Sequence, residues 1–393
     1  MQMPSFDKIL SRVNVAAVLV TGFEACMNFG FVAYAVRVLG DASAANYLVA
    51  TFWFALFVAE LPTGYLTDRW GGRTSLTVSL VLRAAAFLLF YWGAHSTPLV
   101  FLANFIAGVA TTFLTGTFTA QVMCECRHQG VEIDHPRLAA SALFVRSLGL
   151  ILGTAVGYLV VRQAGVRWLW PVSAAWALLA AVYVLARWSA VRARPCMPIV
   201  LHYRSAWSQV LGTRGLLVTM LLFSACRTLL LPISVNAVIL IVPGLDGDPG
   251  QLFVFYLASG LVGLVLAKGF PAVSAFAARQ RMLINVLTVL AIAAVSGGNQ
   301  IVAGLGFLGF LVFSAVSETQ LRHAFYERIP PDHAGAVNSV QSLFENVLGA
   351  LALVLSAVLI SEVSMRSMYL ASALAYLLVC AGAGWARNKS WTA

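Results

Sequence analysis

The segment ELPTGYLTDRWGGRTSL, residues 60–76, separates two apolar runs that are each long enough to cross a membrane. Gly71 and Gly72 lie within it and allow the backbone to reverse within a few residues. Arg69 and Arg73 flank these glycines, and basic residues are concentrated on the cytoplasmic side of membrane proteins. The segment therefore predicts a tight cytoplasmic turn between two membrane-spanning helices.

Composition extends this prediction to the whole chain. Of 393 residues, 60% are hydrophobic and only 10% are charged, and the mean hydropathy is +0.86. Such a chain cannot cover a soluble globule with polar groups, so we expect a polytopic membrane protein. The net charge of +10 does not indicate nucleic-acid binding, because the basic residues are spread over short loops and form no patch.

Twelve apolar stretches are long enough to cross a hydrocarbon core of about 30 Å. They fall at residues 13–39, 43–66, 75–95, 98–123, 138–161, 166–188, 214–242, 251–270, 282–297, 299–321, 334–360 and 363–386. A polar, arginine-bearing stretch separates the first six from the last six. We expect an all-α membrane protein with an N-terminal six-helix bundle at 1–188, a cytoplasmic middle loop at 189–213 and a C-terminal six-helix bundle at 214–393.

The distribution of the 25 lysines and arginines predicts the orientation of the chain. With both termini in the cytoplasm, 18 of them fall on the cytoplasmic side, four fall outside, and three lie inside apolar runs. Cytoplasmic loops ordinarily carry such an excess. We therefore predict a multi-pass protein of the cytoplasmic (inner) membrane with both termini in the cytoplasm.

Residues 64–73, GYLTDRWGGR, resemble the G-x-L-x-D-R-x-G-R-R signature of the major facilitator superfamily, which also lies between the second and third membrane helices. The resemblance implies two pseudo-symmetric bundles that rock about a central site. FEAC at 23–26 and FSAC at 223–226 are a faint trace of such a repeat. The departure from the signature is Gly72, where the family usually has a basic residue.

The same resemblance implies a conformational latch at this turn. The carboxylate of Asp68 is expected to cap the N-terminus of the eleventh helix, near Ala334 and Gly335, when the cytoplasmic side is closed. The predicted latch residues are Gly64, Asp68, Arg69, Gly71 and Arg73.

Other signatures of the family are incomplete. NFIAG at 104–108 stands where proton-coupled exporters usually have R-x-x-x-G, and GLILGTAVG at 149–157 keeps the glycine spacing of the antiporter motif without its Gly-Pro. Both departures weigh against export, and the glycines themselves predict close helix packing. PPDHAG at 330–335 looks like the family's usual inner loop, so the resemblance covers essentially the whole chain.

Seven charged residues lie inside the apolar runs, where each costs on the order of 2.5–3.5 kcal/mol unless it is paired, hydrated or protonated. Glu24 and Arg227 lie near the predicted midplane, on helices that line the central cavity in the resembled family. The other charges are divided between structural ion pairs and a coupling network. The predicted coupling residues are Glu24, Arg227, Glu60, Glu345, Arg146 and Arg83.

Polar residues on the same helices are candidates for the substrate cavity. The threonines among them have an alternative role, because helical hydroxyl groups often bond the preceding turn. The predicted cavity residues are Asn28, Asn104, Thr111, Thr115, Ser224 and Glu318.

We expect neither a metal site nor enzymatic activity. CECRH at 124–128 fits no closed zinc site, so we assign it to the loop after the fourth span. The sequence contains no phosphate-binding loop or nucleophile motif, and the only expected energy source is a proton gradient.

The sequence thus predicts a proton-coupled secondary active transporter that works by alternating access. Glu24 is the expected proton carrier, with Arg227 or Arg146 as its partner. Aromatic side chains on the cavity-lining helices favour efflux of an amphipathic small molecule by antiport. Uptake by proton symport stays open as an alternative, as does a transporter-like sensor or lipid-handling protein that does not pump. The expected partners are this small-molecule substrate and the lipid bilayer, with no nucleic acid, and we expect a monomer.

Overall fold

The computed structural model describes most of the chain. The described residues are 6–115, 117–190, 204, 207–208, 210–212, 214–241, 249–269, 272, 276, 279–297, 299–326 and 334–390. Within these ranges the side chains of some helical residues, Asp68 among them, fall outside the description.

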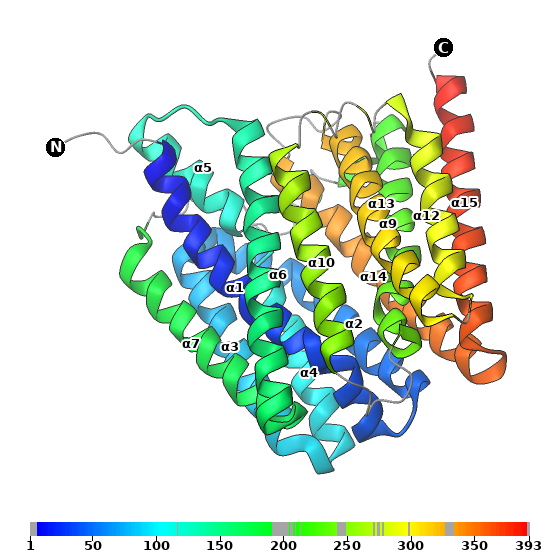
Figure 1. Ribbon diagram of the computed structural model, residues 1–393. Helices are drawn as coiled ribbons and strands as arrows, with labels where there is room; N and C mark the ends of the chain where they lie inside the picture. Colours follow the sequence, from blue (N-terminus) through cyan, green and yellow to red (C-terminus); the bar gives the residue numbers. More distant parts are fainter. Residues whose placement is uncertain are drawn as a thin grey trace. The chain divides into compact units, whose positions relative to one another are not determined.

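Helices make up nearly all of the described residues (Figure 1). Short 3₁₀ turns, η1 (Gly93–His95) and η2 (Val166–Trp168), occur in two of the connections. The helices are α1 (Phe6–Leu39), α2 (Ala42–Trp70), α3 (Gly72–Trp92), α4 (Thr97–Thr112), α5 (Thr117–Gln129), α6 (His135–Ala164), α7 (Leu169–Arg187), α9 (Arg214–Ile241), α10 (Pro249–Lys268), α12 (Arg281–Val295), α13 (Gln300–Tyr326), α14 (Ala334–Glu362) and α15 (Met365–Ser390).

The lengths and compositions of these helices confirm the predicted all-α membrane fold. In the described part of the chain, nine helices are long and apolar enough to cross a membrane. Three shorter apolar helices, Thr97–Thr112, Met282–Val295 and Met365–Ala381, occupy the remaining predicted spans. Among the described residues, the nine long and three shorter helices together match the twelve predicted spans. Each helix satisfies its own backbone hydrogen bonds, as a segment in lipid must.

The fourth predicted span is broken, which the sequence did not predict. A single helix was expected over 98–123, but α4 ends at Thr112 and α5 begins at Thr117. The hydroxyl group of Thr112 donates to the Val109 carbonyl at 2.7 Å, and that of Thr117 to the Phe113 carbonyl at 2.8 Å. Such bonds compete with the regular helical ladder. The CECRH segment, expected in a loop, is instead helical and belongs to α5.

Internal contacts divide the chain into two compact units. Unit 1 contains α1, the second half of α2 from Val58, α3 to α7, and α10. Unit 2 contains the first half of α2, α9, and α12 to α15. The contacts therefore group α10 with α6, on which it packs. The predicted division into two six-helix bundles, 1–188 and 214–393, concerns the internal repeat of the sequence and stays a prediction.

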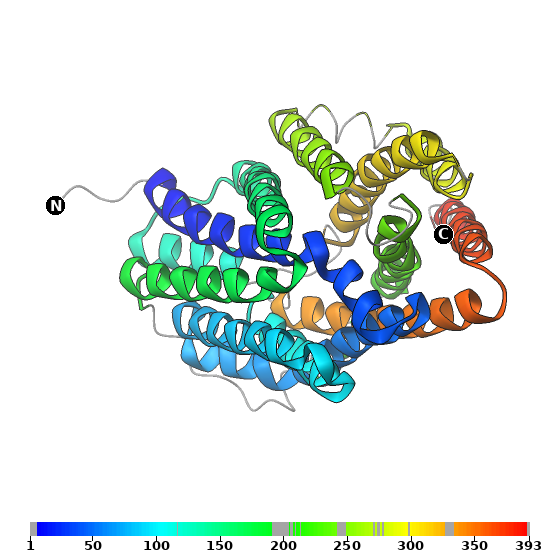
Figure 2. The same ribbon diagram turned by 60° about the horizontal axis from the view of Figure 1, so that its bottom comes forward.

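Small residues bring α1 and α6 together within unit 1. A Cβ atom at Gly149 would collide with Thr21, and one at Gly153 would collide with the backbone carbonyl of Gly22. The backbones of the two helices therefore touch here, as small residues permit. This confirms the packing role predicted for the glycines of 149–157. Figure 2 shows α1 and α6 from a second direction.

Candidate functional site

Unit 1 contains a buried ion pair between α3 and α1. Arg83 donates from Nη2 to Oε1 of Glu24 at 2.7 Å. The arginine side chain is only 4% exposed, whereas the glutamate side chain is 27% exposed. The cation is thus enclosed by protein, and the carboxylate is the member that other molecules can reach.

Unit 2 contains a cluster of one arginine and two glutamates. Arg227 of α9 donates from Nη1 to both carboxylate oxygens of Glu345 at 3.0 Å, and its Nε lies 3.7 Å from Oε1 of Glu318. Here the arginine side chain is 40% exposed, while that of Glu345 is 7% exposed. Glu318 is 27% exposed, so Arg227 is the most exposed member of this cluster and Glu345 is the enclosed one.

The sequence left open whether Glu24 meets Arg227 or Arg146. Within unit 1 the structure pairs Glu24 with Arg83, and within unit 2 it pairs Arg227 with Glu345 and Glu318. The sequence could not choose among the arginines because each lies in a different helix. Arg146 is exposed on α6, and Glu60 is buried in α2. The coupling role of all these residues stays a prediction.

The predicted cavity residues have different environments. The hydroxyl groups of Thr111 and Thr115 donate to the carbonyls of Ala107 and Thr111 at 2.8 and 3.2 Å. This geometry is the bond to the preceding turn that was their alternative role. Asn28 is exposed on α1, whereas Asn104 is buried in α4. Ser224 is also buried, and its hydroxyl group has no hydrogen-bond partner among the described residues.

The turn at the predicted latch is as tight as expected. α2 ends at Trp70, α3 begins at Gly72, and only Gly71 lies between them, with φ of +81°. Glycine adopts this left-handed conformation without the steric cost that other residues meet. Arg73 donates to the backbone carbonyl of Leu185 near the end of α7.

The remaining latch residues are less informative. Gly64 is half-buried and Arg69 is exposed. The side chains of Asp68, Ala334 and Gly335 lie outside the described residues, so the predicted cap stays a prediction.

Gly72 has a packing role that explains its departure from the signature. A Cβ atom at Gly72 would lie 2.6 Å from Oε1 of Gln121 in α5. Gln121 donates from Nε2 to Glu125 at 2.7 Å, and Glu125 also accepts a hydrogen bond from Arg12 at 2.9 Å. A side chain at position 72 would therefore disturb a buried charged cluster.

Sequence reasoning missed several buried polar groups. Glu125 was assigned to a loop, although its side chain is 2% exposed in α5. In unit 2, Ser317 and Tyr376 both donate to Oδ1 of Asn285, at 3.1 and 3.0 Å. Asn285 stands alone in an apolar run, and the burial argument applied to charges would have identified it.

A further missed pair joins α2 to α9 within unit 2. Asn46 donates to Oδ1 of Asn236 at 2.8 Å, and Asn236 donates back to Oδ1 of Asn46 at 3.0 Å. Both residues are fully buried. Each amide thus satisfies the other without any charge.

The aromatic residues that favoured efflux are largely packed in the interior of the units. Phe23 packs edge-on against Phe87, Phe223 stacks on Phe325, and Phe113 stacks on Trp70. Those expected to line a cavity but found buried are Phe23, Phe29, Phe113, Phe223 and Phe310. Their number on these helices is therefore no argument for an aromatic cavity.

Long apolar helices with ion pairs inside their spans are typical of a polytopic membrane protein. The sequence matches the family model described as Major Facilitator Superfamily over residues 13–352. The chain therefore belongs to the Major Facilitator Superfamily, whose members are secondary transporters and not enzymes. No curated protein matches the sequence significantly.

Solved structures of the same fold cover almost the entire chain. The POT family transporter PepTSo superposes with a TM-score of 0.78 at 12% identity, covering 99% of this chain and 100% of its own. The human organic anion transporter MFSD10 (TETRAN) has a TM-score of 0.67 at 15% identity, covering 96% and 99%. A D-xylose-proton symporter has a TM-score of 0.66 at 13% identity, covering 95% of each chain. At these identities the likeness establishes the fold alone.

Proposed function

We propose that this protein is a proton-coupled secondary active transporter that moves a small amphipathic molecule by alternating access. The observation that carries the proposal is the Glu24–Arg83 pair, in which an accessible carboxylate is held by an enclosed guanidinium at 2.7 Å. A guanidinium keeps its proton in proteins, whereas a carboxyl group has a protonated and an ionised form. Glu24 is therefore the proposed proton carrier.

Protonation of Glu24 changes the energy of this pair. The charge-assisted hydrogen bond from Arg83 is stronger than a bond to a neutral carboxyl group. Protonation of Glu24 therefore weakens the electrostatic compensation of the Arg83 charge, whose side chain is only 4% exposed. A change in the packing around α1 and α3 that relieves this state would couple proton uptake to a conformational change.

The unit 2 cluster supplies the proposed substrate contact. Arg227 is 40% exposed and holds Glu318 only at 3.7 Å. An anionic group on a substrate can displace this weaker contact and form a bidentate pair with the guanidinium. Glu345 would then keep Arg227 in position, since it bonds through both oxygens. We therefore propose that the substrate carries an anionic group as well as an apolar part.

The direction of transport has two candidates. Efflux by antiport is the first, although Asn104 stands in place of the exporter arginine and the expected aromatic residues are packed in the core. Uptake by proton symport is the second, and these two observations favour it. A structural neighbour is described as a proton symporter, but the case for protons rests on Glu24 because the identity is only 13%.

We also propose the orientation predicted by the basic residues. Both termini lie in the cytoplasm, the chain resides in the cytoplasmic membrane as a monomer, and the Gly71 turn faces the cytoplasm. Cysteine labelling from either side of the membrane at single introduced sites tests this orientation. Asp68 is proposed to cap the N-terminus of α14 in one state of the cycle.

Purified protein in liposomes tests the proposed function directly. An imposed pH gradient should drive a substrate from a mixed library of drugs and metabolites against its own gradient, and a protonophore should stop it. The side on which the substrate accumulates distinguishes efflux from uptake. A sodium gradient that drives transport when a pH gradient does not would contradict proton coupling. Binding without movement of any compound would favour the non-pumping alternative.

A further inference from the structure

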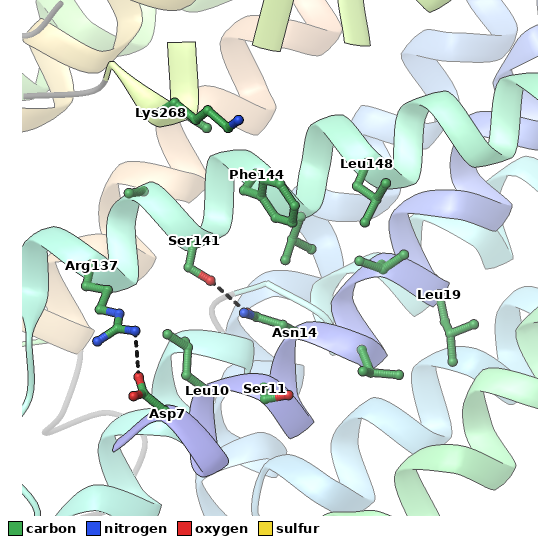
Figure 3. Close-up of a pocket in the computed structure, with 15 residues that line it drawn as sticks. Asp7, Leu10, Ser11, Asn14, Leu19, Arg137, Ser141, Phe144, Leu148 and Lys268 are labelled. Carbon is green, nitrogen blue, oxygen red and sulfur yellow. Dashed lines mark hydrogen bonds and ion pairs between the residues drawn. The ribbon is translucent and has the colours of Figure 1, made fainter. Parts of the chain in front are cut away.

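A groove opens between α1, α6 and the end of α10 within unit 1 (Figure 3). The two long helices touch at Gly153 and Gly22, but nearer their first residues they are joined only by side chains. Ser141 donates to Oδ1 of Asn14 at 2.9 Å, and Arg137 forms an ion pair with Asp7 at 2.9 Å. The resulting wedge encloses about 850 Å³.

The lining of the groove changes from polar to apolar along its length. Asp7 and Arg137 lie together at one end of the groove, and Lys268 borders it from α10 (Figure 3). Deeper residues are apolar, and Val15 and Phe144 remain exposed there. The lining residues of α1 extend from Asp7 to Leu19, which is about 18 Å at 1.5 Å per residue. One leaflet of a bilayer core is about 15 Å thick, so the groove matches one leaflet.

The polar end of the groove favours an anion. Asp7 is neutralised by Arg137, whereas Lys268 has no ion-pair partner among the described residues. Asn14 and Ser11 are uncharged polar residues that also line the groove. A phosphate group beside Lys268 would meet a cation that has no ion-pair partner among the described residues.

We propose that this groove binds one anionic phospholipid of the adjacent leaflet. An acyl chain lies between α1 and α6 along Val15, Leu19 and Phe144, and the phosphate lies beside Lys268. The lipid fills the wedge that the helices leave open and ties the end of α10 to α1 and α6. This inference needs only that the chain spans a membrane, so its test is independent of substrate, coupling ion and direction of transport.

Native mass spectrometry of the purified protein tests the lipid preference. Phosphatidylglycerol and phosphatidylcholine with identical acyl chains are added at equal concentration. The wild-type protein should retain one phosphatidylglycerol under conditions that remove phosphatidylcholine. Equal retention of the two lipids would overturn the proposal, because the groove would then select no headgroup charge.

Substitution of Lys268 locates the preference. Lys268→Gln should weaken phosphatidylglycerol binding about fivefold, which corresponds to about 1 kcal/mol for one basic side chain beside anionic lipid. Arg187→Gln is the matched control, because Arg187 also lies in the last turn of a helix and does not line the groove. Binding that is unchanged in Lys268→Gln, or reduced equally in both variants, would overturn the assignment.

Filling the groove tests the position of the acyl chain. Val15→Trp places a large ring among the exposed lining residues and should weaken lipid binding at least about tenfold, the factor that two buried CH₂ groups provide. Val182→Trp on α7 is the control, since Val182 is 63% exposed and lies outside the groove. Lipid retention that survives Val15→Trp would contradict the proposal. The proposal would also be contradicted if Val15→Trp, and not Val182→Trp, abolished dimerisation or the binding of a transport substrate. The occupant of the groove would then be a second copy of the protein or the substrate, and not a lipid.

Discussion

The two charged assemblies of this transporter differ in how far their arginines are exposed. In unit 1 the arginine is 4% exposed and its glutamate 27%, whereas in unit 2 the arginine is 40% exposed, Glu318 27% and the closest glutamate, Glu345, 7%. Because a guanidinium keeps its proton, only protonation of Glu24 can change the net charge of the unit 1 pair. In unit 2 the arginine is the most exposed member. This difference is the basis for the proposed proton exchange at Glu24 and the proposed anion recognition at Arg227.

The largest expected effect comes from removing the exchangeable proton in unit 1. Glu24→Gln keeps the size and polarity of the side chain but cannot ionise. We expect accumulation driven by a pH gradient to fall at least about 100-fold, as for other groups that transfer protons, while downhill exchange continues. Liposome uptake measures both. Glu362→Gln is the control, because Glu362 is exposed at the end of α14. A Glu24→Gln variant that still concentrates substrate would exclude Glu24 as the carrier.

The second largest expected effect is a difference in protein stability between variants of the two charged assemblies. Glu24→Ala removes the carboxylate bonded to the enclosed Arg83 and should reduce the free energy of unfolding by about 3–5 kcal/mol. Glu345→Ala leaves Arg227 hydrated and near Glu318, so its loss should be only about 1–2 kcal/mol. Denaturant unfolding of both variants in one detergent measures the difference. Equal losses would show that exposure of the arginine does not decide the cost.

Arg227→Gln tests anion recognition in unit 2. We expect the half-saturating concentration of an anionic substrate to rise about tenfold, the factor for one charge-assisted hydrogen bond. A neutral analogue of the same substrate should be affected much less. Arg366→Gln is the control, since Arg366 is exposed in the first turn of α15. A comparable rise for the neutral analogue would make the role of Arg227 structural.

The smallest effect should come from the uncharged pair, which calibrates what a buried polar contact contributes without charge. Asn46→Ala, Asn236→Ala and the double variant form a cycle whose coupling energy should be about 0.6 kcal/mol and at most about 1.7 kcal/mol. Thermal unfolding of the four proteins gives this value. A coupling energy as large as the value of about 3–5 kcal/mol expected for Glu24→Ala would show that charge is not what makes the buried ion pair important.

Helix positions were predictable because the membrane constrains them locally. The predicted spans 138–161 and 334–360 lie within α6 and α14, since apolar length alone decides whether a segment can cross. The break between Thr112 and Thr117 was not predictable in this way. Hydroxyl bonds to the backbone at Thr112 and Thr117 and the stacking of Trp70 on Phe113 accompany the break, and none of these contacts changes the hydropathy of the segment.

The candidate site was predictable only in part. The cost of a charge in lipid identified Glu24, Arg83, Arg227 and Glu345 as residues that need partners. It could not say which residue pairs with which, because pairing depends on the packing of helices distant in sequence. Glu125 was missed for the opposite reason, since the charged segment around it resembles a loop although α5 continues through it.

The contact between Gly72 and Gln121 bears on how this sequence can evolve. A basic residue at position 72, as in the family signature, needs the space that Gln121 fills, and Gln121 also holds Glu125. The contacting atom is the end of a flexible side chain, so a basic residue at position 72 would displace the Gln121 amide from its bond to Glu125. We therefore expect substitutions at positions 72 and 121 to be epistatic, with a smaller cost of a basic residue at position 72 when residue 121 is small.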